Sequence, residues 1–402
     1  MTSRFSTPEG AWTHGTNTYF SHTRRVETRE EAVGGFDTLT NLTDAPLPLM
    51  HRHEVSLDAA PKRLWIAGLE QPQGQGGAQS PANPTLCLET GAMRFGLLPL
   101  DDVFRIHNAT YVTPEFAGIA DNHLVLAPGA TYTAEWALIP QGEYWAFINA
   151  TRRLVEANFT IDGGFAFLRN GPLTEAWSDE LLADFLRFKD PKYVTATIAG
   201  PLYNGTYPHG TAFQKIDHTS YREAFARWRR LAPGRQCLVY FHSFIDVVED
   251  SPERYQDARL LAPDGSQADY GRPHDRIFIP LSTNSYGPAI EKNVDVILDD
   301  IGADGIYWDE HQYSRVHYHY GEPWDGFSGD IDGNTFQLSR LKSSVTLLTE
   351  SWRLPLAKKI LARGPLIGNG PPFTRAMAAL NFPCFVETGS ITHAVQSHLY
   401  SP

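Results

Sequence analysis

Two hydrophobic patterns divide the chain near residue 140. Before that point, short apolar runs are separated by Gly, Pro, Asn and Asp, and residues 131–138 alternate between polar and apolar side chains. Alternation with a period of two is typical of an antiparallel strand that buries one face. Residues 1–142 are therefore predicted to form an antiparallel β-sandwich domain.

The second pattern alternates apolar runs with amphipathic segments. Residues 143–158 are expected to form a linking helix, and in residues 159–402 helices alternate with six predicted strands, at 159–168, 193–199, 237–242, 305–309, 366–368 and 384–387. Such alternation predicts an α/β fold with a parallel sheet, either an open doubly wound sheet or a (β/α)8 barrel. No glycine-rich phosphate loop follows the first strand, so the barrel is favoured. Because a complete barrel has eight strands, this one is expected to be incomplete, differently closed or truncated after its sixth strand.

The stretch IGADGIYWDE, residues 301–310, carries the clearest signal for chemistry. Apolar residues recur at helical spacing from Pro288 to Ile301, and Gly302 is suited to end that helix. The β-branched and aromatic run that follows is typical of a buried parallel strand. Ligands bind at the carboxyl ends of such strands, which is where Asp309 and Glu310 are placed.

The other predicted strands also end in polar groups that would meet at one mouth. Two carboxylates, Asp309 on the fourth strand and Glu387 on the sixth, suit hydrolysis of a glycosidic bond: one attacks or stabilises the anomeric carbon, and the other protonates the leaving oxygen. Nearby aromatic side chains suit stacking on sugar rings. The residues expected to contact the substrate are His242, Tyr203, Asn369, Glu310, Trp308 and Asp162.

Composition excludes several classes of function. A net charge of -12 without a cluster of Lys or Arg argues against a nucleic acid or an anionic membrane as partner. The three cysteines lie far apart in apolar runs, and His311, His317 and His319 lack strict ligand spacing, so neither a metal nor another cofactor is expected. The N-terminal residues lack a signal-peptide pattern, and no apolar run approaches the length of a membrane span. This predicts a cytoplasmic protein, or a secreted one whose leader has been removed.

The segment GADGIYWDE resembles the fourth-strand motif of retaining glycoside hydrolases of the α-galactosidase and α-glucosidase type. In that motif a helix ends in a Gly-x-Asp-Gly turn, an apolar strand follows, and its last residue is the nucleophilic Asp. The resemblance implies a barrel preceded by a β-sandwich, a carbohydrate substrate, Asp309 as nucleophile and Glu387, which closes the run FPCFVE, as acid/base. Those families mostly carry Asp rather than Glu at the second position, and the exact family and sugar are left open.

Two other kinds of function fit the same residues. A non-catalytic carbohydrate-binding or scaffold protein could keep the fold without the reaction. An isomerase or lyase acting on uronic sugars would use His242 or Tyr203 as its base. The separation of the Asp309 and Glu387 carboxyl groups is the distinguishing feature, because glycosidase chemistry fails beyond about 10 Å.

Overall fold

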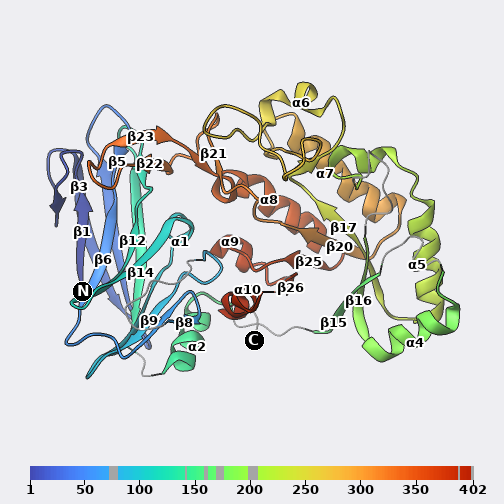
Figure 1. Ribbon diagram of the computed structural model, residues 1–402, viewed down its shortest axis with the longest axis horizontal. Coiled ribbons are helices and arrows are strands. Elements are labelled where there is room, and N and C mark those ends of the chain that lie inside the picture. Colours follow the sequence, from blue (N-terminus) through green and yellow to red (C-terminus); the bar gives the residue numbers. More distant parts are fainter. Residues whose placement is uncertain are drawn as a thin grey trace.

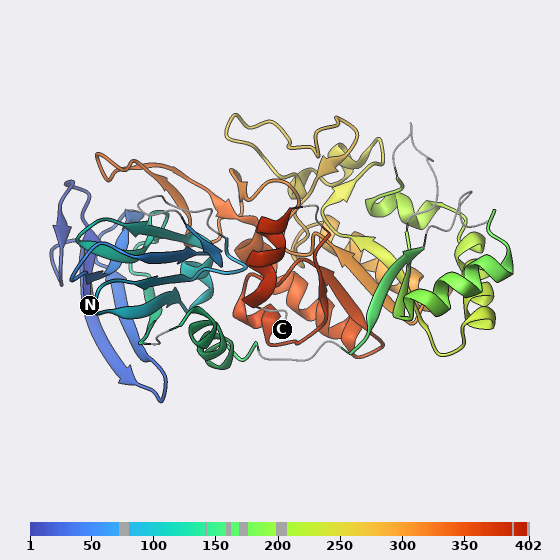
Figure 2. The same ribbon diagram turned by 60° about the horizontal axis from the view of Figure 1, so that its bottom comes forward.

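A computed structural model of the chain describes residues 1–71, 80–140, 143–157, 162–168, 176–197, 207–387 and 390–399. One part of the molecule consists of two antiparallel sheets, and the other of a parallel sheet covered by helices (Figure 1). The two parts lie side by side along the long axis of the molecule, as the turned view in Figure 2 also shows.

The antiparallel sheets face each other as a sandwich. In spatial order the first contains β11 (Asn108–Val112), β12 (Phe116–Asp121), β6 (His51–Ser56), β1 (Thr2–Ser6) and β2 (Trp12–Thr13). The second contains β3 (Phe20–Thr28), β4 (Val33–Asn41), β14 (Thr131–Ile139), β10 (Arg94–Pro99), β9 (Leu86–Glu89), β7 (Arg63–Ile66) and β8 (Leu69–Glu70). Helix α1 (Asp102–His107) and the pair β5 (Leu47–Pro48) and β13 (Val125–Leu126) accompany them. Residues of both sheets, among them Phe5, Leu39, Leu97 and Ile119, form one buried core, in agreement with the predicted sandwich.

Strand β14 shows how the sequence pattern arises. Tyr132 and Trp136 are buried in the core between the sheets. Ala137 and Ile139 pack instead with Phe147 of helix α2 (Tyr144–Leu154). At its carboxyl end β14 is apolar on both faces, because helix α2 covers the face that points away from the core between the sheets.

The parallel sheet has six strands among the described residues. In spatial order they are β15 (Gly164–Leu168), β16 (Pro191–Ala196), β17 (Gln236–His242), β20 (Gly305–Asp309), β25 (Leu366–Asn369) and β26 (Cys384–Phe385). Every neighbouring pair is parallel and follows the order of the sequence, which is the winding of a barrel, whereas a doubly wound sheet reverses its order. The sheet curls until the rings of Phe165 on β15 and Phe385 on β26 lie 4.8 Å apart, although no backbone pairing joins these two strands in the ranges described.

Helices cover the outer face of this sheet. The longer ones are α4 (Asp179–Lys189), α5 (Thr219–Leu231), α7 (Tyr286–Asp295) and α8 (Val345–Leu361), and the shorter ones are α6 (Ser251–Arg254), η1 (Gly210–Lys215), η2 (Gln256–Ala258) and α9 (Arg375–Ala378). The last two helical segments, α10 (Ile391–Gln396) and η4 (Ser397–Leu399), lie instead against β8 and α2 beside the sandwich. Buried side chains such as Phe225, Ile290 and Trp352 pack from the helices onto Val239 and Ile306. Of the helices described, none has the length and apolar character needed to cross a bilayer.

The segment before β20 explains how Asp309 reaches the end of its strand. Helix α7 continues through the π-helical turn η3 (Val296–Asp300), and Gly302 then adopts a φ of +74°, the left-handed conformation that ends helices. A Cβ on Gly305 would lie only 2.1 Å from the Pro365 carbonyl oxygen, so glycine lets β20 approach β25 closely. The strand that follows is buried throughout until Asp309.

Two long excursions leave the sheet after β17 and β20. The first contains β18 (Ile245–Asp246) and β19 (Arg276–Ile277), and the second contains β21 (Tyr318–His319), β22 (Gly329–Ile331), β23 (Leu338–Leu341) and β24 (Ser343–Ser344). The second excursion reaches the sandwich, where the amide of Val125 donates to the Phe327 carbonyl at 2.7 Å (Figure 1). It therefore ties the two parts of the molecule together.

A chain of buried polar groups crosses the sandwich and was not expected from the sequence. The rings of His51 and His53 are joined at 2.9 Å, and His107 lies 2.9 Å from Asp121 and 2.8 Å from the Ser328 hydroxyl of the second excursion. Burial lowers the pKa of His51, and burial together with repulsion from His51 lowers that of His53 further. Burial also opposes the charged form of His107, but the Asp121 carboxylate outweighs it and raises the pKa of His107. The folded protein therefore resists protonation of His51 and His53 and favours protonation of His107.

We expect the free energy of unfolding to fall as the pH drops from about 6.5 to 5. The unfolded chain then protonates His53 while the folded chain keeps it neutral, so acid favours unfolding, by about 2 kcal/mol for this residue over that range. Urea unfolding of the wild-type protein and of His53→Gln at several pH values measures this effect. Over this pH range the free energy of unfolding of the variant should fall by about 2 kcal/mol less than that of the wild-type protein. His107 acts in the opposite direction, but it is present in both proteins and does not affect the difference. If the free energies of unfolding of the two proteins depended on pH in the same way, His53 would not be neutral in the folded chain and the prediction would be contradicted.

Candidate active site

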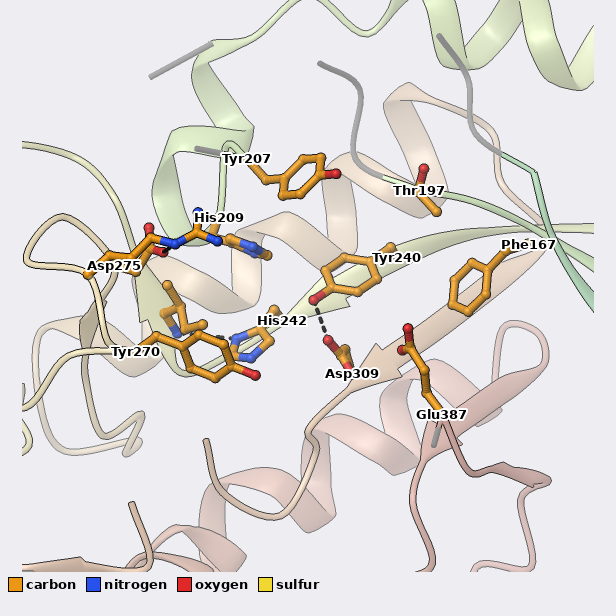
Figure 3. A pocket seen from close by; sticks show the side chains of 12 residues that line it. Phe167, Thr197, Tyr207, His209, Tyr240, His242, Tyr270, Asp275, Asp309 and Glu387 are labelled. Atoms are coloured by element: carbon orange, nitrogen blue, oxygen red, sulfur yellow. Dashed lines mark hydrogen bonds and ion pairs between the residues drawn. The ribbon is translucent and has the colours of Figure 1, made fainter. Parts of the chain in front are cut away.

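A cavity of about 480 Å³ opens at the carboxyl ends of the parallel strands (Figure 3). The strand ends and the loops that follow them supply its walls, and the first excursion closes one side. The residues that line it are Phe167, Thr197, Tyr207, His209, Tyr240, His242, Ile245, Tyr270, Arg272, Asp275, Asp309 and Glu387. The predicted convergence of strand ends on one mouth thus has a counterpart in the structure.

Asp309 is the last residue of β20 and its carboxylate faces the cavity. The hydroxyl of Tyr240, on the neighbouring β17, donates a hydrogen bond to Oδ2 (Figure 3). Asn369 Nδ2, at the end of β25, donates one to Oδ1 at 2.5 Å. Two neighbouring strands therefore fix the orientation of the carboxylate.

Glu387 follows β26 and shares a partner with Asp309. Asn369 Nδ2 lies 3.3 Å from Glu387 Oε2, and the Glu387 amide donates to Asn369 Oδ1 at 3.2 Å. Because Asp309 Oδ1 is 2.5 Å and Glu387 Oε2 is 3.3 Å from the same nitrogen, these two oxygens are at most 5.8 Å apart. Burial and then the negative charge of Asp309 raise the pKa of Glu387, while the hydrogen bond from Asn369 opposes this. The pair therefore combines a hydrogen-bonded carboxylate with an acid that retains its proton to higher pH.

Glu310 lies beside the cavity but does not line it. Its backbone has a φ of +46°, and its carboxylate accepts hydrogen bonds from Ser314 at 2.6 Å, Tyr270 at 2.8 Å and His242 at 3.1 Å. Burial alone would raise the pKa of Glu310, but these hydrogen bonds outweigh it and lower the pKa. Glu310, which was predicted to contact the substrate, thus supports two residues that do line the cavity, Tyr270 and His242.

His242 is held in one orientation. Its Nδ1 faces the amides of Phe244 and Ile245, both at 3.2 Å, so it accepts, and the proton is on Nε2, which donates to Glu310. Both ring nitrogens are occupied. The arrangement gives no support to His242 as the base of an isomerase or lyase.

Two of the predicted contacts lie away from the cavity. Trp308 is fully buried in the core beneath the helices, with its Nε1 donating to the Ser243 hydroxyl at 3.1 Å, because consecutive strand residues point to opposite faces and Asp309 takes the inner one. Asp162 precedes β15 instead of following the first strand, so it lies at the opposite end of the sheet, paired with Lys192 and with the Tyr193 hydroxyl. Tyr203 lies outside the described residues.

Three lining residues were missed because they lie on one loop. Tyr270, Arg272 and Asp275 belong to the first excursion, whose length between β17 and α7 is the one signal in the sequence that could have drawn attention to it. His209 is held near the cavity by the turn that follows it, since Gly210 has a φ of +67° and a Cβ there would lie 2.5 Å from Asp246 Oδ2. Burial lowers the pKa of His209 to about 3, so its ring is neutral.

The residues described contain no group of three or more His, Cys, Asp or Glu side chains arranged to hold a metal ion. His311 binds the Gly370 carbonyl at 3.0 Å, and His319 accepts from the Leu261 amide at 3.0 Å. Each of these two histidines thus hydrogen-bonds the backbone of a different loop.

Comparison with known proteins gives matches in structure but not in sequence. No protein-family model matches the chain, and no curated protein does so either. Solved structures that match include an alpha-galactosidase from Lactobacillus brevis (10% identity, TM-score 0.54, 99% of this chain and 64% of that one), a GH36 alpha-galactosidase from Geobacillus stearothermophilus in complex with raffinose (9%, 0.56, 100% and 67%) and an alpha-N-acetylgalactosaminidase from Bifidobacterium bifidum (8%, 0.52, 100% and 77%).

The likeness extends over the whole chain, which spans 64% of the length of the Lactobacillus brevis enzyme. At 8 to 10% identity it concerns the fold, and it agrees with the resemblance noted for residues 301–310. The chain therefore has the fold of the GH36 alpha-galactosidases and related glycoside hydrolases, in which a β-sandwich precedes a barrel-wound parallel sheet.

Proposed function

We propose that the protein is a retaining glycoside hydrolase with Asp309 as nucleophile and Glu387 as acid/base. The observation that carries the proposal is the Asn369 amide shared by the two carboxyl groups, which limits the Asp309 Oδ1 to Glu387 Oε2 distance to 5.8 Å. Retaining enzymes hold their carboxyl groups about 5 to 5.5 Å apart, and inverting enzymes about 6.5 to 9.5 Å apart to make room for a water. The spacing supports retention.

The two carboxyl groups divide the reaction between them, and Glu387 acts in both of its steps. Asp309 attacks the anomeric carbon while Glu387 donates its proton to the glycosidic oxygen, and the carbon–oxygen bond to the leaving group breaks as an ester bond to Asp309 forms. Glu387, now ionised, takes a proton from water, which attacks the anomeric carbon and releases Asp309. Tyr240 and Asn369 hold the nucleophile in place through both steps.

Enzymes of similar fold indicate where to look for the sugar. The Geobacillus stearothermophilus alpha-galactosidase has been solved with raffinose and with stachyose, and the Bifidobacterium bifidum enzyme is an alpha-N-acetylgalactosaminidase. Sugars of galacto configuration in α linkage are therefore the first substrates to test. Tyr207, Tyr240, Tyr270 and Phe167 in the cavity wall supply aromatic faces of the kind that stack on sugar rings.

Proton NMR of the first product formed from an aryl α-galactoside tests the proposal. The account requires α-galactose to appear first and to equilibrate later. Initial release of the β anomer would reject the retaining mechanism. A chain that binds sugars but hydrolyses none of a panel of aryl glycosides would favour the non-catalytic alternative.

Replacing Asn369 with Ala should lower kcat about 100-fold, because it removes a donor that orients both carboxyl groups. The Asn369 hydrogen bond also lowers the pKa of Glu387, so its loss raises that pKa and moves the basic limb of the kcat/KM profile to higher pH. Rates across pH for Asn369→Ala and for a control, Asn334→Ala, measure both effects, since Asn334 lies exposed on the turn between β22 and β23. A basic limb that stays in place would contradict the assignment of Glu387 as the acid.

A further inference from the structure

At one end of the cavity lies Arg272, whose only ion pair within the described residues is a long one, to Asp275. Arg272 lines the cavity with its side chain 65% exposed. Its nearest carboxylate oxygen, Asp275 Oδ2, is 3.9 Å from Nε, which is too far for a hydrogen bond. Within the described part of the chain, no partner binds the two terminal amino groups of this guanidinium. Its outer edge is thus open.

A second guanidinium lies against the same turn. Arg315 comes from the excursion after β20, has a φ of +52° and is exposed. A Cβ on Gly271 would come within 2.2 Å of Arg315 Nη1, so this guanidinium rests on the backbone directly beside Arg272. No ion pair of Arg315 is found in the ranges that the structure describes. Arg315 does not itself line the cavity, but its contact with Gly271 places it next to the turn that carries Arg272, which does line it.

The turn between them is built to hold this arrangement. The Tyr270 amide donates to the Asp275 carbonyl at 2.8 Å, the Asp275 amide donates to the Arg272 carbonyl at 3.0 Å, and Asp269 accepts from the Gly271 amide at 2.6 Å. Gly271 has a φ of +86°, which favours glycine. The Tyr270 side chain is fixed in turn by Glu310. The position of Arg272 is therefore determined by the fold of the loop.

Charge is distributed unevenly across the cavity. Asp309 and Glu387 lie at one end and Asp275 and His209 at the other (Figure 3), and His209 is neutral. Arg315 lies against Gly271 and Arg272 follows Gly271 in the chain, so the positive charges of both arginines act at this turn. Their planar forks match the oxygens of a carboxylate or sulfate, which accept two parallel hydrogen bonds. In a chain with a net charge of -12, such a pair is an exception that points to a ligand.

We infer that the cavity accepts a sugar that carries an anionic substituent, a carboxylate or a sulfate, and that Arg272 and Arg315 bind this group. The inference rests on the proposed function for the orientation of the sugar, with the anomeric carbon at Asp309 and the anionic group toward Arg272. It concerns the substrate class of that same site. A neutral sugar would offer no anionic partner to the open terminal amino groups of Arg272.

Calorimetric titration of the intact protein with galacturonic acid, galactose 6-sulfate and galactose tests the inference. At low ionic strength at least one of the charged sugars should bind about 10- to 100-fold more tightly than galactose, and this preference should shrink as salt is added. The charged sugar that binds more tightly identifies the substituent as carboxylate or sulfate.

Variants assign the effect to the two arginines. Arg272→Gln keeps hydrogen-bond donors but loses the charge and should abolish the preference, and Arg315→Gln should reduce it. Arg276→Gln is the matched control and should leave it unchanged, because Arg276 lies in β19 of the same excursion, does not line the cavity and donates to the Glu249 carbonyl. Equal binding of charged and neutral sugars, binding of none of them, or a preference that survives Arg272→Gln would overturn the inference.

Binding and turnover can fail separately. A chain that binds galacturonate through Arg272 but hydrolyses no glycoside would keep the inference and reject the proposed function. A chain that hydrolyses neutral aryl α-galactosides and shows no preference for a charged sugar would keep the proposed function and reject the inference.

Discussion

Asp309→Asn is expected to lower kcat/KM at least about 10⁴-fold on any glycoside that the protein hydrolyses. The amide cannot attack the anomeric carbon, and the covalent intermediate is lost. The fold should survive, because Asn has nearly the same shape as Asp: its Oδ1 can still accept the hydrogen bond from Asn369, and its Nδ2 can donate to the Tyr240 hydroxyl oxygen. Initial rates on aryl glycosides, together with the thermal midpoint of the variant, measure the effect.

Asp300→Asn provides the comparison for this experiment. Asp300 is exposed at the end of the helix that leads into β20, so its substitution makes the same chemical change nine residues away without touching the cavity. We expect wild-type rates for Asp300→Asn. Wild-type rates for Asp309→Asn as well would remove the nucleophile from the account.

Glu387→Gln is expected to lower kcat about 10²- to 10⁴-fold on glycosides with poor leaving groups. The loss should be much smaller for nitrophenyl glycosides, because nitrophenolate leaves without being protonated. Since the pKa of Glu387 is raised, the wild-type acid keeps its proton to higher pH, and the basic limb of the pH profile should report its titration. That limb should vanish in the variant.

Leaving-group dependence separates a catalytic loss from a structural one. A damaged cavity would slow both kinds of substrate equally, as would any loss of folded protein. Glu249→Gln serves as control, because Glu249 is exposed and does not line the cavity. An equal loss on both substrates, with the basic limb still present in Glu387→Gln, would assign the acid to another residue.

The position of Asp309 could be predicted because several local signals agree there. The helical spacing before it, the glycine that ends the helix and the short apolar strand each follow from rules that act over a few residues. Glu387 could be predicted once the strands were counted, since parallel strands in sequential order bring their carboxyl ends together. The six predicted strands are all found in the sheet.

Other predictions failed for identifiable reasons. Trp308 could have been excluded from the sequence, because the alternation of side chains along β20 cannot place both it and Asp309 in the cavity. Asp162 was misplaced because the limits of the first strand were uncertain, and the structure begins β15 only at Gly164. The contributions of Tyr270 and Arg272 depend on how a long loop folds back over the mouth, and no periodic pattern records that path. The bridging role of Asn369 likewise depends on a tertiary contact between β25 and the residue after β26.

Trapping of the glycosyl-enzyme intermediate tests the central claim most directly. A fluorinated galactosyl fluoride, which forms the covalent intermediate quickly and releases it slowly, would be incubated with the protein and the digest examined by mass spectrometry. The account predicts one sugar per chain, attached to the peptide that contains Asp309 and absent from Asp309→Asn. Attachment to a different residue, or turnover of the substrate without any adduct and with inversion at the anomeric carbon, would contradict it.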